Sequence, residues 1–406
     1  MKKLTAIISL LLTITTLTSC TPLPDAPEES PPWRIAIITN CLESGDEENY
    51  RAAQALVARF GDDRVMHRTS ALSFGWIDWS PIIEEIAQDS EIQAIIISTS
   101  GFFMGPTAPA IDELLATRDD IFAVYTGPSL YPMLSSSDIA QRSNLIIQTN
   151  SNIGEIYVMQ AISMGAQTIA HYSFPRHLYI PFIAERRNSM KAAAEREGIR
   201  FVELTSLDPM EVSTSAYAVA FIEQDLPTRV EEFGVNTAFF GTSCVMQSAI
   251  ISGVMATGAI FVQTCCPSPY HGYPAAFGVD YRVYTGEYAD WRTSMMRLID
   301  LPELVGTIDD AVYSAGMTGR ISGWAIPADM MWTTIGFMYA IEWINGNVPQ
   351  EPGVICLDTL ERMAREYTAK LGFDSGATLS LFTFYGDDFS HFVLGTVDYH
   401  IFGGND

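Results

Sequence analysis

Short apolar runs rich in β-branched residues alternate with amphipathic stretches along most of this chain, and this alternation constrains the fold more than any other feature. The first run spans residues 34–40 and is followed by a helical pattern over 46–60. Similar runs at 94–99 and 121–126 are also separated by a helical pattern. A strand buried on both faces reads as an unbroken apolar run, and helices between such strands provide the crossovers of a parallel sheet. The sequence therefore predicts an α/β fold.

The pattern of strands and helices restarts midway along the chain. A strand is expected at 168–173, and a helix at 216–233 contains Pro227, which should break or kink it. The remaining strands are expected at 201–205, 237–241 and 260–264. We therefore expect two Rossmann-like lobes with parallel sheets, an N-terminal lobe over 33–150 and a C-terminal lobe over 151–275.

The last third of the chain, residues 276–406, is less regular. We expect a strand at 276–284, a helix at 290–299 and a long buried helix at 328–344. Aromatic and polar residues alternate from 379 to 402, which predicts strands or a hairpin. This part is expected to supply the crossings between the lobes, the long helix and a C-terminal extension that completes the lobes.

The N-terminus has the form of a secretory signal. Two lysines precede an apolar run over 4–17, which is too short for a comfortable membrane span, and the sequence Leu17-Thr18-Ser19-Cys20 follows. This ending resembles the lipobox of bacterial lipoproteins, which implies a signal peptide over 1–19 and lipidation of Cys20. Residues 20–32 would then be a flexible linker, and the mature protein would be anchored by lipid at the extracytoplasmic face of the cell membrane. An ordinary signal peptide with a chance cysteine is the alternative.

Charge and cysteine content bound the possible partners. Acidic residues outnumber basic ones, 48 against 23, for a formal net charge of −25. Such a surface repels phosphate backbones, so no nucleic-acid partner is expected. Five cysteines follow Cys20, and the adjacent pair Cys265-Cys266 lacks the C-x-x-C spacing of a redox pair or of half a zinc site. We expect these cysteines to be small buried apolar groups, with no metal and no cofactor.

Polar and aromatic residues recur where the predicted strands end. In open α/β sheets, ligands bind at the carboxyl ends of the strands, where helix N-termini offer unpaired N–H groups. The candidate ligand-binding residues are Thr39, Asn40, Ser100, Phe102, Phe103, Tyr125, Thr126, Ser173, Phe174, His177, Ser243, Thr264, Tyr270 and Asp280. For any single serine or threonine, capping of the following helix is an equally good interpretation.

Two features of this set point more specifically to a ligand. Phe102 and Phe103 lie together on a predicted loop, where they could stack on a ring. Asp280 ends the sequence Gly278-Val279-Asp280 and could accept hydrogen bonds from ligand hydroxyls or amines, although a helix cap or a surface acid is the alternative.

An enzyme is not expected. The chain contains no G-x-S-x-G, G-x-G-x-x-G, P-loop or H-E-x-x-H motif. Cys41 and His177 could in principle act as a thiol nucleophile and its base, but packing is the better interpretation of that cysteine.

Two α/β halves of this size, a lipobox, an acidic linker and Gly278-Val279-Asp280 together resemble the type I periplasmic binding proteins, the solute receptors of ABC transporters. Within that family the chain most resembles the basic membrane lipoprotein group, which includes purine-nucleoside receptors, or a poorly characterised relative of that group. The resemblance covers about residues 33–347 and implies that Asp280 contacts the ligand. The extension over 353–406 is longer than usual for the family.

The resemblance implies capture of a small ligand between the lobes and its delivery to an ABC permease. A nucleoside is the first expectation for the ligand, because aromatic side chains suit stacking on a flat ring, and a sugar or an amino acid is the second. The alternatives are a membrane-anchored ligand sensor and a surface-tethered hydrolase.

Overall fold

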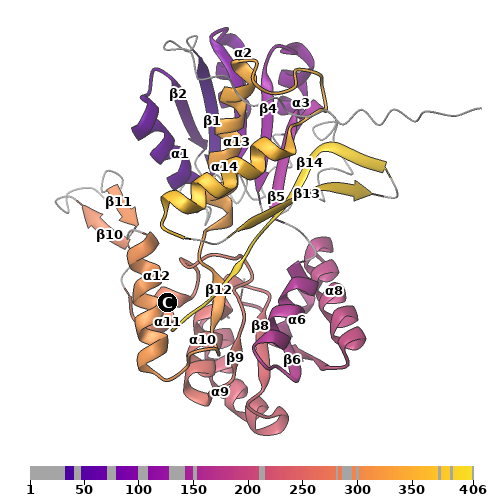
Figure 1. Ribbon diagram of the computed structural model, residues 1–406, viewed down its shortest axis with the longest axis vertical. Helices are drawn as coiled ribbons and strands as arrows, with labels where there is room; N and C mark the ends of the chain where they lie inside the picture. The colour runs from indigo at the N-terminus through magenta and orange to yellow at the C-terminus, as the bar shows by residue number, and fades with distance from the viewer. Residues whose placement is uncertain are drawn as a thin grey trace, which may run out of the picture.

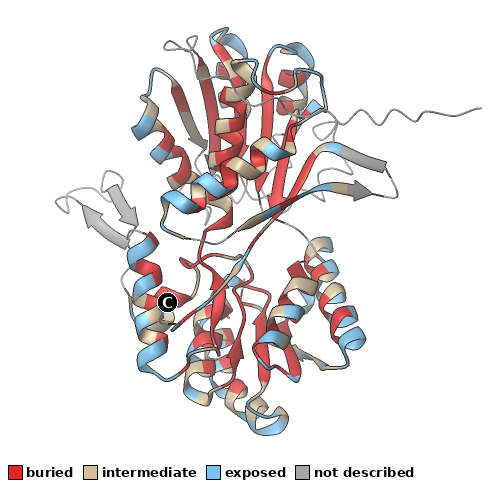
Figure 2. Cartoon of the chain, in the orientation of Figure 1, coloured by how far each residue is buried: buried red, intermediate tan, exposed pale blue. Residues whose placement is uncertain are grey.

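Two α/β lobes lie one above the other along the long axis of the molecule (Figure 1). This computed structural model describes residues 33–40, 47–70, 79–98, 108–127, 142–149, 153–209, 215–279, 282–285, 295–298, 301–373, 376–384 and 387–404. The central strands of both sheets are buried, and many exposed residues lie on the outer helices (Figure 2).

The N-terminal lobe contains a seven-stranded sheet in the order β13-β14-β5-β4-β3-β1-β2. All its described pairings are parallel except β13 with β14. Its strands are β1 (Arg34–Asn40), β2 (Val65–Ser70), β3 (Ile92–Ser98), β4 (Phe122–Gly127), β5 (Leu145–Thr149), β13 (Ala377–Phe384) and β14 (Asp387–Val397). The apolar runs predicted to be central strands are therefore confirmed as β1, β3 and β4.

Helices cover both faces of this sheet. Successive residues of β1 enter opposite core clusters: Ile35 and Ile37 join one, whereas Ala36 and Ile38 join the other. The first cluster lies under α1 (Glu47–Phe60) and α13 (Ala328–Ile344), with α14 (Leu357–Lys370) packed on α13. The second lies under α2 (Ser80–Gln88) and α3 (Ala108–Thr117). Burial on both faces explains why β1 reads as a continuous apolar run.

The C-terminal lobe repeats this arrangement around a sheet in the order β7-β6-β8-β9. Its strands are β6 (Thr168–Ser173), β7 (Arg200–Thr205), β8 (Thr237–Gly241) and β9 (Ile260–Phe261). Its helices are α6 (Ile153–Ser163), α7 (Pro175–Leu178), α8 (Pro181–Glu197), α9 (Ser215–Phe233), α10 (Cys244–Thr257), α11 (Tyr273–Phe277) and α12 (Leu301–Ser314). A parallel bridge from Phe261 to Ile321 places β12 (Ser322–Trp324) beyond β9.

The strands of both lobes follow one topology. Numbered within each lobe, the order is 2-1-3-4-5, and the chain passes between the lobes from β5 to α6, from β12 to α13 and from β14 to β15 (Tyr399–Ile401). The last two crossings lie side by side because β12 and β15 pair antiparallel. This is the type I periplasmic-binding-protein architecture, as expected.

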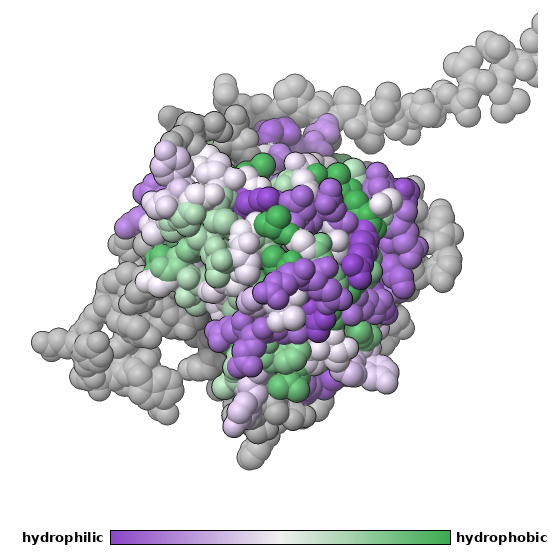
Figure 3. Space-filling view, turned by 90° about the horizontal axis from the view of Figure 1, so that it is seen from below, coloured by the Kyte–Doolittle hydropathy of each residue, from purple (hydrophilic) through white to green (hydrophobic). Residues whose placement is uncertain are grey.

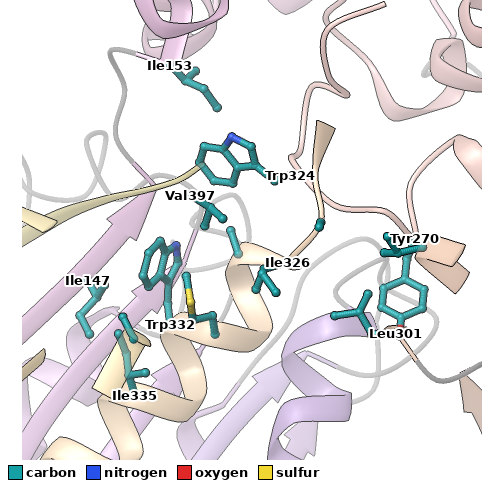
Figure 4. Close-up of a cluster of buried hydrophobic side chains, with 14 of the residues drawn as sticks. Ile147, Ile153, Tyr270, Leu301, Trp324, Ile326, Trp332, Ile335 and Val397 are labelled. Carbon is teal, nitrogen blue, oxygen red and sulfur yellow. The ribbon is translucent and has the colours of Figure 1, made fainter. Parts of the chain in front are cut away.

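Buried side chains link the lobes at the crossings. One core cluster contains residues of both lobes, and Figure 4 shows Trp324, Ile326 and Val397 close together within it. Among the described residues, no helix has the length and apolar character needed to cross a membrane. Seen from the end of the C-terminal lobe, the surface mixes hydrophilic and apolar residues (Figure 3).

Two local predictions were wrong, and the break that was one of the two outcomes expected at Pro227 is absent. Helix α9 continues through Pro227 without a break. The strand expected at 276–284 is instead the end of α11, followed after Gly278 by β10 (Arg282–Thr285). Gly278 ends the helix with φ +67°, a left-handed conformation that favours glycine. Within 290–299, the described residues form β11 (Met295–Leu298) rather than a helix, because they pair antiparallel with β10.

Candidate functional site

The carboxyl ends of the two sheets face one another. Glu48, in the first turn of α1, follows the carboxyl end of β1, and its side chain is buried. Ser268, in the segment after β9, donates a hydrogen bond from Oγ to Glu48 Oε1. His271 Nε2 lies 3.4 Å from the same oxygen. This contact joins the site edges of the two lobes directly.

The C-terminal lobe presents a polar cluster at its edge. The hydroxyl groups of Ser173, the last residue of β6, and Thr242, directly after β8, lie 3.0 Å apart. His177 Nδ1 lies 3.0 Å from Thr242 Oγ1, and its ring stacks on Phe174 at a centroid distance of 4.7 Å. Burial, aided by the charge of Arg186, lowers the pKa of His177 to about 4. The imidazole is therefore neutral at pH 7 and can exchange hydrogen bonds with an uncharged ligand.

In the N-terminal lobe, the predicted residues whose side chains are described are buried inside the lobe. Thr39 Oγ1 is 2.8 Å from His67 Nε2, and Thr126 Oγ1 donates to Ser98 Oγ at 2.9 Å. Both threonines are buried, and Tyr125 packs in the core cluster under α2 and α3. Burial raises the pKa of Tyr125 well above its ordinary value. The two threonines thus join neighbouring β-strands inside the lobe, and Tyr125 is part of the core.

The other predicted residues either belong to the C-terminal lobe or lie outside the described part of the chain. Ser243 is the N-cap residue of α10 but makes no capping hydrogen bond with its side chain, so capping does not explain it. Thr264 Oγ1 donates to the Cys266 carbonyl at 2.7 Å, and Tyr270 is buried close to Leu301 (Figure 4). Asn40 ends β1, and its side chain is outside the described part. Also outside the described residues are Ser100, Phe102, Phe103, Asp280 and the lipidation candidate Cys20.

The cysteines depart from the prediction that each is an isolated apolar group. Cys356 is disulfide-bonded, whereas Cys244, Cys265 and Cys266 are free thiols. These three thiols form a cluster: the sulfur of Cys244 lies 3.4 Å from that of Cys265 and 3.5 Å from that of Cys266. The hydrogen bonds among the three thiols shift their pKa values in both directions, and burial of the sulfur atoms raises the pKa of each thiol well above the ordinary value.

Several residues of this region were absent from the predicted set. Glu48, Thr242, His271 and the three clustered cysteines come together only because the crossings and the pairing of β8 with β9 bring distant segments into contact. For Thr242 a sequence signal existed, since it follows directly after a predicted strand. For Glu48 and Cys244 there was none, because their partners lie 220 and 21 residues away.

The contact between Glu48 and Ser268 should be measurable. In Glu48→Ala, the Ser268 hydroxyl loses its acceptor inside the protein, and we expect the free energy of unfolding to fall by about 1–2 kcal/mol. Glu48→Gln keeps an acceptor oxygen and should lose less. Urea denaturation measures both values, and equal losses in the two variants would show that the acceptor is unimportant.

Comparison with known proteins places the chain in a family. The sequence profile of a family of proteins of unknown function, DUF3798, matches residues 33–322. The chain belongs to the DUF3798 family. An uncharacterized protein of Treponema pallidum (strain Nichols) is 25% identical over 198 residues, which is 48% of this chain and 86% of the relative.

A solved structure shares the fold of this DUF3798 protein. A provisionally assigned transcriptional regulator from Clostridium difficile 630 superposes with a TM-score of 0.71 at 18% identity, covering 91% of this chain and 99% of that one. A periplasmic ribose ABC transporter protein from Conexibacter woesei DSM 14684 is similar with a TM-score of 0.47 at 14% identity, covering 77% of this chain and 86% of that one. At such identities the likeness concerns the fold alone.

Proposed function

We propose that this DUF3798 protein is an extracytoplasmic solute-binding protein that encloses a small polar ligand between its two lobes. The observation that carries the proposal is the contact of Glu48 with Ser268, because it joins the carboxyl edge of one sheet to the carboxyl edge of the other. In open α/β sheets, ligands bind at that edge. A site formed by two facing edges can surround a small ligand with polar groups from both sides.

The ligand would contact the polar cluster of the C-terminal lobe. Ser173, Thr242 and His177 supply hydroxyl groups and a neutral imidazole, and Phe174 supplies an aromatic face. The predicted residues Asn40, Ser100, Phe102, Phe103 and Asp280 would complete the site. Closure of the lobes about their three crossings would then bury the ligand.

An uncharged ligand suits this edge best. Arg176 is held by Asp208 through two hydrogen bonds of 2.8 Å, so its charge is already balanced. Hydroxyl groups and a neutral imidazole recognise sugar-like hydroxyls and heterocyclic nitrogens. We therefore keep a nucleoside as the first candidate ligand, with sugars and amino acids as the second.

The cellular setting is part of the same proposal. Lipidation of Cys20 would tether the protein, and residues 20–32 would leave the lobes free to dock on an ABC permease, which raises the local concentration of the receptor. Cys20→Ala should then release a protein that binds its ligand unchanged. Loss of ligand binding in the released protein would contradict this division of labour.

A thermal-shift screen tests the proposal. Nucleosides, sugars and amino acids would each be added to the purified protein, and a specific ligand at a thousandfold excess over its Kd should stabilise it by about 4 kcal/mol. The hit should lose affinity in Thr242→Val, while the exposed Tyr217→Ala serves as the control. Chemical turnover of a hit would contradict a binding function and favour a hydrolase.

A further inference from the structure

The three clustered thiols have a geometry that solute binding does not explain. We infer that Cys244, Cys265 and Cys266 form a binding site for a zinc ion, with the fourth coordination position open to a ligand from outside the chain. The inference does not rest on the proposed function, because it depends only on the three thiols and the side chains around them.

The sulfur separations match those of a tetrahedral thiolate site. The three distances are 3.4, 3.5 and 3.9 Å. Zinc–sulfur bonds of about 2.3 Å at tetrahedral angles require sulfur atoms about 3.8 Å apart, whereas a planar three-coordinate ion with the same bonds requires about 4.0 Å. A zinc ion would therefore sit about 1 Å out of the plane of the three sulfurs, as at three corners of a tetrahedron.

The backbone holds the cluster in place before any ion binds. Thr264 Oγ1 and His271 Nδ1 lie 2.7 and 3.0 Å from the Cys266 carbonyl oxygen. Gly272, with φ +78°, lets this segment approach α10, since a Cβ there would lie 2.5 Å from the Cβ of Gln247. Cys244 is the first residue of α10, so the same approach brings its sulfur to the other two.

A buried arginine supplies the second observation. Arg186 is 8% exposed and has no carboxylate partner among the described residues. Its Nη1 donates to the Cys265 carbonyl at 2.7 Å, and its guanidinium group lies over the ring of Phe240. Buried charges are normally paired. Three thiolates and one Zn²⁺ carry a net charge of −1, which Arg186 would balance.

The fourth position is open to solvent. Within the described part of the chain, only these three residues group closely enough to share an ion, so no fourth His, Cys, Asp or Glu completes the shell. Cys265 is buried, but Cys244 is exposed, so an ion can enter from that side. Zinc sites with three protein ligands keep the fourth place for water or another molecule.

Metal analysis of the reduced full-length protein tests the inference. After equilibration with Zn²⁺ and removal of free metal, we expect one zinc ion per chain. Co²⁺ in its place should give the charge-transfer absorption of thiolate ligands. Cys244→Ser should weaken Zn²⁺ binding by more than about 100-fold, beyond what loss of an outer-shell contact causes. The exposed neighbouring variant Val245→Ser should bind like the original protein.

Three results would overturn the inference. The first is a reduced, folded protein that retains no zinc. The second is equal Zn²⁺ affinity in Cys244→Ser and Val245→Ser, with matching circular dichroism spectra showing that both are folded. The third is a disulfide between two of the three cysteines in the protein as isolated, found by thiol counting and peptide mapping, since a disulfide draws two sulfurs to about 2.05 Å and removes them as ligands.

Discussion

Trp332→Ala is expected to lower the free energy of unfolding by about 3–5 kcal/mol, the largest effect of any substitution considered for this protein. Trp332 is fully buried in α13, and its Nε1 donates to Thr149 Oγ1 of β5 at 3.2 Å. The same indole packs on the neighbouring strand β14, where a Cβ at Gly395, the residue paired with Thr149, would lie 2.4 Å from Trp332 Cη2. One side chain thus holds α13 against two strands beside the crossings.

Equilibrium urea denaturation gives the comparison. Trp343→Ala, also in α13, is the matched control, because Trp343 is only partly buried and stacks on Phe122 at a centroid distance of 4.9 Å. It should lose clearly less stability than Trp332→Ala. An equal or larger loss in Trp343→Ala would mean that the contact of Trp332 with β5 and β14 is not a principal support of the lobe.

His171→Phe should remove about 2 kcal/mol of acid sensitivity. His171 is 1% exposed in β6, and burial lowers its pKa to about 3, aided by the charges of Arg186 and Arg187. The unfolded chain takes up this proton near pH 6.5, but the folded protein does not, so stability falls as pH drops below about 6.5. Between pH 7 and pH 5 this linkage amounts to about 2 kcal/mol.

The measurement compares the free energy of unfolding at pH 7 and pH 5 in both proteins. This window lies above the ordinary pKa values of carboxyl groups, which limits their contribution. Phenylalanine suits the site, because His171 already stacks on Phe240 at a centroid distance of 5.5 Å, and its Nε2 has no hydrogen-bond partner in the described part of the chain. The prediction fails if the original protein and His171→Phe lose equal stability between the two pH values.

The regular elements could be predicted because their signals are local. Residues 34–40 and 328–344 are β1 and α13 as expected, since a doubly buried strand and a buried helix each leave a continuous apolar pattern in sequence. The strand predicted at 276–284 was wrong because short aromatic and apolar runs suit both a strand and a one-turn helix. There the left-handed glycine and the pairing of β10 with β11 decide the outcome.

The candidate site could be predicted only in part. Ser173 and His177 were predicted because strand ends are visible in sequence, and the structure brings both to Thr242 at one edge of the sheet. The same rule chose Thr39 and Thr126, but it cannot tell which hydroxyl groups are used up inside the lobe. The contact of Glu48 with Ser268 and the cluster around Cys244 depend on segments far apart in the chain. No local sequence pattern predicts either contact.

Hydrogen–deuterium exchange with a bound ligand tests the central claim most directly. With the hit from the thermal-shift screen, the account predicts slower exchange in both lobes, at the start of α1 around Glu48 and in the segments around Thr242 and Ser268. Exchange should be unchanged around Gly198, between the end of α8 and the start of β7, because the amino ends of the strands lie at the opposite edge of the sheet. Protection confined to one lobe, or absent from the facing edges, would contradict a ligand held between the lobes.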